Sequence, residues 1–255
     1  MRKLINWKLF FLLLVACLLS TWLIVPFQLA LSPLPVEVPM PLVLLSALVN
    51  NLILLVPCLF LGLLLGGRLG LGLPIIEGAL RGEPSLKRLK SILPISVGCG
   101  ALGFALTVLL SLPFWDLTLS LLKIESALPP WKGLLASFYG GIVEESMFRL
   151  FLLSLFIWIT TKIKRAEDGS PTKLGVWISI VVVGILFGLG HLGITSDLTA
   201  IEGSVVLRAV LLNGSLSLFL GWLYWRKGLE SAIIAHFTAD IFLHVLAPIV
   251  ASLLL

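Results

Sequence analysis

Long apolar runs separated by short polar connections dominate this chain. A helix needs about 20 apolar residues to cross the hydrocarbon core of a bilayer. Two connections blur the count, because residues 67–90 can hold a surface helix and residues 115–124 can form an interfacial or re-entrant segment. The sequence therefore predicts an all-α membrane helix bundle of six to eight spans. The best count is about seven: Leu9–Leu31, Leu42–Gly66, Ser91–Leu112, Gly133–Thr161, Leu174–Leu192, Val205–Trp225 and Leu229–Leu255.

Composition agrees with a polytopic membrane protein. Hydrophobic residues make up 59% of the chain and charged residues 12%, with a mean hydropathy of +1.13. No soluble domain needs that much apolar surface. The 255 residues suit a single membrane domain, 1–255, with no room for a separate soluble one. The pairs Gly62/Gly66 and Gly184/Gly188 have the small-xxx-small spacing that allows close helix packing.

The net charge is +5, and most of the basic residues lie in four patches in or beside alternate predicted loops. With the amino terminus in the cytoplasm, all four patches face the cytoplasm, which is the positive-inside pattern of an integral multi-pass protein. The pattern indicates contact with membrane lipids and excludes a nucleic-acid-binding surface. The patches comprise Arg2, Lys3 and Lys8; Arg68, Arg81, Lys87, Arg88 and Lys90; Lys162, Lys164, Arg165 and Lys173; and Arg226 and Lys227.

The three cysteines, Cys17, Cys58 and Cys99, all lie in apolar runs without CxxC spacing. Such cysteines are typical packing residues. We therefore expect neither a disulfide nor a zinc–thiolate site.

One predicted span contains three charged residues. Glu144, Glu145 and Arg149 lie within the apolar run 133–161, where each charge costs at least about 2.5–3.5 kcal/mol. On a helix Glu145 and Arg149 share a face at i, i+4 spacing and can form an ion pair. Glu144 points roughly 100° away from that face and is left without a local partner.

All three histidines of the chain also lie in apolar segments. His191 ends the sequence FGLGH, which begins at Phe187, and the last predicted span contains His236, Asp240 and His244. These last three are four residues apart, so they lie on one helical face. A lone histidine in a span is often a packing residue, and His244 is better explained as a polar residue near the helix end.

Together these side chains have the chemistry for activating water. A desolvated carboxylate beside a histidine can accept a proton from water near neutral pH, a role that suits Glu144 and His191. A second donor pair, His236 and Asp240, can stabilise the oxyanion formed on an amide, provided that the pair shares a proton. The same four residues could instead bind a divalent metal such as zinc. The residues alone leave both alternatives open.

The three motifs resemble those of the CAAX-protease and bacteriocin-processing (Abi) family of intramembrane endopeptidases. The family pattern is EExxxR, FxxxH and HxxxN or HxxxD on three separate membrane helices, and the match covers residues 131–244. Residues 1–112 carry no signature. The resemblance implies that Glu144 is the general base, that His191 holds the water, and that His236 and Asp240 form the oxyanion site. It also implies that Glu145 and Arg149 orient the site, that Phe187 packs beside it, and that no metal or other cofactor is required.

One position departs from the pattern of prenyl-protein proteases. Those enzymes tend to have Asn where this chain has Asp240, and an ionised Asp would repel an oxyanion. The departure strengthens the zinc alternative and weakens the case for a prenylated substrate.

The sequence therefore predicts an intramembrane endopeptidase that acts on a membrane-associated peptide, either prenylated or bacteriocin-like. Two alternatives belong to other classes. One is a non-catalytic membrane immunity or scaffold protein. The other is a proton-coupled transporter that uses the buried carboxylates as a relay, although the discontinuous paired helices typical of transporters are not evident in the sequence.

Simple helix geometry conflicts with a shared site. At 1.5 Å per residue, His191 lies about 27 Å from Lys173 and Glu144 about 27 Å from Lys162, whereas His236 lies only about 14 Å from Lys227. Straight helices that start at one membrane surface would put these side chains at different depths. Helix tilt, a broken helix, or basic residues drawn into the membrane must then compensate.

Overall fold

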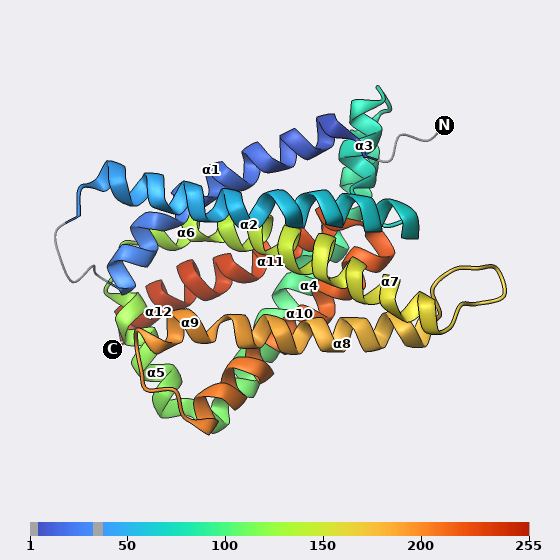
Figure 1. Ribbon diagram of the computed structural model, residues 1–255. Coiled ribbons are helices and arrows are strands. Elements are labelled where there is room, and N and C mark those ends of the chain that lie inside the picture. Colours follow the sequence, from blue (N-terminus) through green and yellow to red (C-terminus); the bar gives the residue numbers. More distant parts are fainter. Residues whose placement is uncertain (1–4, 33–37, 255) are drawn as a thin grey trace.

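The computed structural model describes residues 5–32 and 38–254. This part of the chain is built from helices, and its β structure is limited to one isolated bridge between Arg165 and Pro171. Figure 1 shows the helices packed in a bundle in which their axes run in several directions. The elements are α1 (Trp7–Leu31), α2 (Met40–Leu69), α3 (Pro74–Leu80), α4 (Ser85–Ser111), η1 (Leu112–Phe114), α5 (Trp115–Ser126), α6 (Pro130–Phe138), η2 (Tyr139–Glu144), η3 (Ser146–Leu153), α7 (Ser154–Ile163), α8 (Lys173–Gly190), α9 (Leu192–Ser196), α10 (Gly203–Lys227), α11 (Leu229–Asp240), η4 (Ile241–Leu246) and α12 (Ala247–Leu254).

The prediction of a polytopic helical bundle is confirmed. Six helical stretches of the described chain are long and apolar enough to cross a membrane. The predicted span 133–161 is not among them, because π-helical turns, η2 and η3, divide its helix between α6 and α7. The six stretches are Trp7–Leu31, Met40–Leu69, Ser85–Ser126, Lys173–Ser196, Gly203–Lys227 and Leu229–Leu254.

The two connections that blurred the count are both partly helical. Residues 67–90 contain the short helix α3, as the surface-helix interpretation anticipated. The amide N–H groups of Ile75 and Ile76 at its start donate to the Glu230 carboxylate (2.8 and 2.9 Å). Residues 115–124 lie in α5, which continues from α4 through one 3-10 turn and buries none of its side chains.

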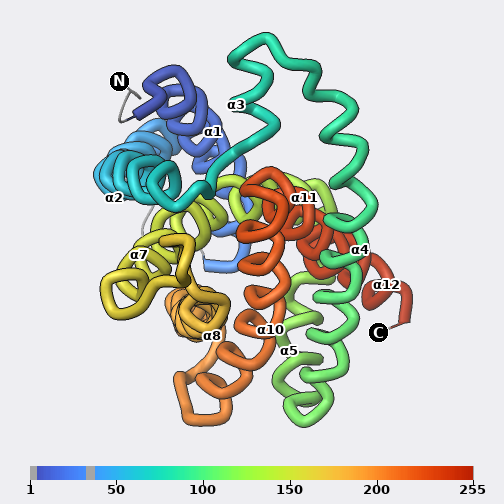
Figure 2. Tube along the Cα trace, turned by 90° about the vertical axis from the view of Figure 1, so that its right-hand side faces the viewer, coloured from blue at the N-terminus to red at the C-terminus, as the bar shows by residue number. Residues whose placement is uncertain are grey.

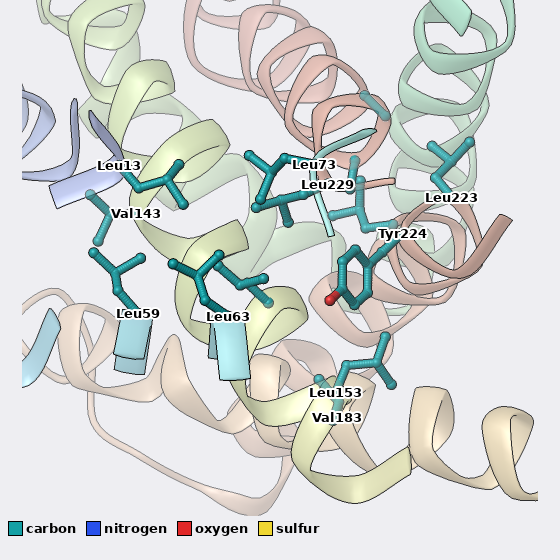
Figure 3. Close-up of a cluster of buried hydrophobic side chains, with 14 of the residues drawn as sticks. Leu13, Leu59, Leu63, Leu73, Val143, Leu153, Val183, Leu223, Tyr224 and Leu229 are labelled. Atoms are coloured by element: carbon teal, nitrogen blue, oxygen red, sulfur yellow. The ribbon is translucent and has the colours of Figure 1, made fainter. Parts of the chain in front are cut away.

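The helix that carries the two glutamates lies at the centre of the bundle. Its π-helical turns contact α1, α2, α10 and α11, and Figure 2 shows this yellow-green segment between α2 and α11. Its apolar side chains Val143, Leu150, Leu153 and Ile157 are fully buried in the main core cluster. Figure 3 shows part of this cluster, with side chains from α1, α2 and α10 closing around the same helix.

Glycines let the helices approach closely, as their spacing predicted. A Cβ atom at Gly62 would lie 2.9 Å from Leu150, and one at Gly188 would lie 2.6 Å from the Cα atom of Val210. Both distances are shorter than a real Cβ contact. The contacts of α2 with η3 and of α8 with α10 therefore depend on residues without a side chain.

The expected conflict in depth is partly resolved by an offset between helix pairs. The hydroxyl groups of Tyr224 and Ser154 are 2.8 Å apart, so the end of α10 lies beside a residue eight positions before Lys162. That separation corresponds to about 12 Å along α7. The rings of Trp225 and Trp177 also pack edge to face, with centroids 6.4 Å apart. The turn between α10 and α11 therefore lies deeper in the bundle than the α7–α8 loop, which projects beyond it in Figure 1. Because Tyr224 is itself three residues before Lys227, the inward position of the basic residues Arg226 and Lys227 amounts to about 7.5 Å, or about half of the difference.

Candidate active site

A fully buried ion pair forms the floor of the site. The side chains of Glu145 and Arg149 have no exposed surface, and Glu145 Oε1 lies 3.0 Å from Arg149 Nη1. The predicted i, i+4 pair is therefore present. Glu145 Oε1 also lies 2.8 Å from His236 Nδ1, and Arg149 Nη2 donates a hydrogen bond to Ser217 Oγ (2.7 Å). These contacts tie η3, α10 and α11 together through one charged group.

Glu144 occupies the open side of the same cluster. Its Oε2 atom lies 4.0 Å from His191 Nε2 and 3.9 Å from His236 Nε2, too far for direct hydrogen bonds. The side chains of Glu144 and His191 remain 23% and 30% exposed, whereas that of His236 is 4% exposed. In the described part of the chain, Glu144 has no partner on its own helix, and it thus faces two histidines from other helices.

Hydrogen bonds define which ring nitrogen of each histidine carries a proton. His191 Nδ1 lies 2.8 Å from the carbonyl oxygen of Phe187. A carbonyl oxygen only accepts, so Nδ1 donates, and neutral His191 turns an unprotonated Nε2 toward Glu144. His236 Nδ1 faces a Glu145 oxygen that already pairs with Arg149, so this Nδ1 also donates. In both rings Nε2 is the nitrogen directed at the Glu144 carboxylate.

Asp240 completes the group from the same helix as His236. Its Oδ1 atom lies 3.5 Å from His236 Nε2, and its side chain is 9% exposed. Across the gap between helices lies Gly140, where a Cβ atom would overlap Asp240 Oδ2 and come within 3.2 Å of His236 Nε2. The close approach of η2 to α11 therefore requires glycine at position 140.

Phe187 packs against both the buried charge and the histidines. The Arg149 guanidinium lies over its ring, 4.5 Å from the centroid, in a cation–π contact. The His191 and His236 rings meet the same ring edge to face, with centroids 4.7 and 5.6 Å away. The aromatic ring thus separates the ion pair from the more open side of the site.

Two of the motifs lie on or beside π-helical turns. Glu144 ends η2, Glu145 separates it from η3, and Asp240 directly precedes η4. The π-helix is rare and concentrates at functional positions, because its i→i+5 pattern re-aims the side chains that follow. The local backbone therefore deviates from a regular α-helix where the polar residues converge.

The structure brings Glu144, His191, His236 and Asp240 together but places His244 elsewhere. His244 Nδ1 lies 3.0 Å from Glu125 Oε2, and its ring packs edge to face on Phe27. This residue fastens η4 to α5, in line with the structural interpretation of its sequence position.

Sequence reasoning missed two residues that shape the site, Gly140 and Ser217, and it also missed the contact of Glu125 with His244 outside the site. Gly140 had a visible signal, because a Gly-Gly pair directly precedes the glutamates. Ser217 is one of several serines in an apolar span and carries no pattern of its own. Glu125 was assigned to a connection, so its contact with a membrane helix could not be anticipated.

The geometry also bears on the zinc alternative. Among the described residues, no three His, Cys, Asp or Glu side chains are grouped so as to hold a metal ion. Zinc bonds of about 2.0–2.2 Å in a tetrahedron bring ligand atoms about 3.3–3.6 Å apart. The separations of 3.9 and 4.0 Å around Glu144 are wider than that, so the four residues do not form a preassembled tetrahedral shell.

Comparison with protein-family models identifies a related family. Residues 126–242 match the protein-family model described as Type II CAAX prenyl endopeptidase Rce1-like. The matched stretch contains all three motifs and every residue of the site described above. Searches of curated proteins and of solved structures found no significant match to this chain.

Proposed function

We propose that this integral multi-pass membrane protein, whose residues 126–242 match the CAAX prenyl endopeptidase family model, is a metal-independent endopeptidase in which Glu144 activates the attacking water. A protease of the CAAX type is the activity that the family match supports. The observation that carries the finer assignment is the position of Glu144, a part-exposed carboxylate 3.9 and 4.0 Å from the Nε2 atoms of two histidines.

The attack step follows from the donors and acceptors around Glu144. A gap of about 4 Å exceeds a hydrogen bond, and one water molecule can bridge it. Such a water donates one proton toward Glu144 Oε2 and the other toward the lone pair on His191 Nε2. As its oxygen attacks the peptide carbonyl carbon, Glu144 takes the proton.

The resulting oxyanion and the leaving group need a proton donor each. His236 and Asp240 face one another at 3.5 Å, and with one shared proton they can donate to the oxyanion. Protonated Glu144 then returns its proton to the amide nitrogen as the carbon–nitrogen bond breaks. The Glu145–Arg149 pair holds His236 through its Nδ1–H, which leaves Nε2 directed at the reacting atoms.

Replacement of Glu144 by Gln tests the role of the base. The amide is nearly isosteric but cannot accept the proton, so cleavage of a membrane-associated peptide should fall by about 10²–10⁴-fold. The matched control is Glu125→Gln, which alters a carboxylate on α5 that contacts His244 and lies outside the site. The control should keep wild-type activity and both variants should unfold at the wild-type temperature. Unchanged cleavage by Glu144→Gln would refute the proposed mechanism.

The same assay addresses the other predicted functions and the metal. An immunity or scaffold protein would bind a partner without cleaving it, and a transporter would show pH-dependent flux instead of products. We expect activity to survive prolonged treatment with a zinc chelator. Loss of activity that returns when zinc is added would establish a metal mechanism in its place.

We further propose that the substrate is a lipidated or otherwise membrane-bound peptide and that the amino terminus is cytoplasmic. Paired peptides of one sequence, prenylated and unmodified, test the first point, since a substrate delivered by the membrane should be cleaved much faster with its lipid. A reporter that is active only in the cytoplasm, fused before residue 1, tests the second.

A further inference from the structure

A cavity lies at the basic end of the bundle, apart from the site around Glu144. It has a volume of about 310 Å³ and is bounded by the ends of α2, α7, α8 and α10 and by the α7–α8 loop. Along α8 it is 18 residues, or about 27 Å, away from His191. Its volume is at the lower end of the range of small-molecule sites. The lining residues are Leu69, Gly70, Leu71, Ile157, Ser170, Pro171, Lys173, Val176 and Trp225.

Most of the side chains that line this cavity are apolar, while backbone groups, Ser170 and Lys173 give it polar surface as well. Apart from the indole of Trp225, only Ser170 and Lys173 among the lining residues have a polar side chain. Trp225 forms one wall and is braced by Trp177 through their edge-to-face contact. Such a lining suits an amphipathic ligand, with an apolar chain against the apolar side chains and a polar group against the polar surface.

Cations gather at the rim. Lys173 lines the cavity and is exposed, and the guanidinium of Arg226 lies 5.2 Å from the centroid of the Trp225 ring. No acidic side chain is among the lining residues. The nearest acid in the loop, Asp168, instead accepts a hydrogen bond from the backbone N–H of Ser170 (2.9 Å). The one charged residue among those that line the cavity is therefore the cation Lys173, and Arg226 packs on the Trp225 wall.

The cavity also lies at the depth where lipid head groups are found. It is formed by the ends of three membrane-spanning helices, and tryptophans such as Trp177 and Trp225 favour this interfacial level. The amino-terminal end of α8, with the partial positive charge of its dipole, opens toward the same place. We propose that this cavity binds an anionic phospholipid, with its phosphate at Lys173 and Arg226 and part of one acyl chain against the apolar side chains of the lining.

Binding of phosphatidylglycerol to the purified full chain in detergent tests this proposal, with phosphatidylcholine as the competitor. Native mass spectrometry reports how many molecules of each lipid the protein retains. We expect one preferred phosphatidylglycerol. Lys173→Gln should weaken its retention about fivefold, the factor expected when one basic residue contributes about 1 kcal/mol near an anionic head group. The matched control is Lys90→Gln, which removes an exposed charge on α4 that does not line the cavity.

A second pair of variants tests the interior of the cavity. Ser170→Trp places bulk at the mouth and should reduce retention strongly, whereas Ala166→Trp adds the same bulk to the same loop outside the lining. The two residues are joined by a backbone hydrogen bond, in which the Ala166 N–H donates to the Ser170 carbonyl oxygen (3.0 Å). A change of either side chain leaves this bond in place, so the loop should tolerate both variants.

Three results would overturn the proposal. Equal losses in Lys173→Gln and Lys90→Gln would show general charge attraction. Retention unaffected by Ser170→Trp would show that the cavity is not used. Displacement of the lipid by free glycerol 3-phosphate at similar concentration would show a phosphate site without an acyl-chain site. Because the measurement is lipid retention, its outcome is independent of whether the chain cleaves a peptide.

Discussion

A methyl group at position 140 should disable the site while leaving the fold largely intact. Gly140 lies in η2, where a Cβ atom would overlap Asp240 Oδ2 and approach His236 Nε2 to 3.2 Å. Gly140→Ala therefore forces Asp240 and the His236 ring away from Glu144. The next residue offers a matched control, because a Cβ at Gly141 would meet the Ile233 carbonyl oxygen at 3.3 Å and the Phe237 Cβ at 3.4 Å.

The expected magnitudes separate the two variants. Moving a reacting group by about 1 Å can cost about 10²-fold in rate, so kcat for Gly140→Ala should fall by about that factor. Overpacking costs about 1–3 kcal/mol, and the better helix propensity of alanine returns about 1 kcal/mol. Gly140→Ala should thus be only modestly destabilised. In Gly141→Ala the neighbours need to shift by a few tenths of an ångström, so its stability and kcat should both stay near wild type.

The assay is peptide cleavage in detergent or vesicles, with kcat and KM measured separately, together with thermal unfolding of each variant. A positional effect lowers kcat with little change in KM, because binding contacts remote from the reacting atoms persist. Equal kcat values for Gly140→Ala and Gly141→Ala would refute the argument that glycine at 140 places Asp240 and His236.

Three further predictions concern the charged scaffold. Arg149→Met should destabilise the protein by about 3–5 kcal/mol in chemical unfolding, because it leaves the Glu145 carboxylate buried without its cation. Ser217→Ala should cost about 1–3 kcal/mol by the same measurement, since the buried guanidinium loses the hydroxyl that accepts from Nη2, and Ser217→Thr should recover part of the loss. Glu230→Ala should release the first turn of α3, with faster hydrogen exchange at residues 75 and 76 and an unchanged rate of peptide cleavage, whereas unchanged exchange would contradict the capping role.

The polar motifs could be recognised from sequence because charge in a membrane span is costly and their spacing is regular. The i, i+4 relation of Glu145 and Arg149 predicted a pair that the structure contains, and the same periodicity singled out Glu144. The helical fold class followed from the apolar runs alone. These features depend on local geometry, which the order of residues determines directly.

Features that depend on how one helix lies against another could not be predicted in this way. The depth conflict arose from the assumption that basic residues mark one membrane plane, whereas the contact of Tyr224 with Ser154 places the α10–α11 turn about 7.5 Å deeper than Lys162. The division of the predicted span 133–161 by π-helical turns has the same origin, since widened turns carry no clear sequence signal. Ser217 became part of the site only through the orientation of α10.

Two consecutive glutamates here meet different surroundings: one is fully buried against a guanidinium, and its neighbour is partly exposed and faces two imidazoles. Adjacent residues on a helix differ by roughly 100° in direction. Rotating this helix by a single residue would exchange the two acids, putting a sealed, cation-bound carboxylate where the open one is needed. Burial of the Glu145–Arg149 pair therefore fixes the rotation of this helix, and an insertion or deletion in this segment should be far more damaging than a substitution of similar size.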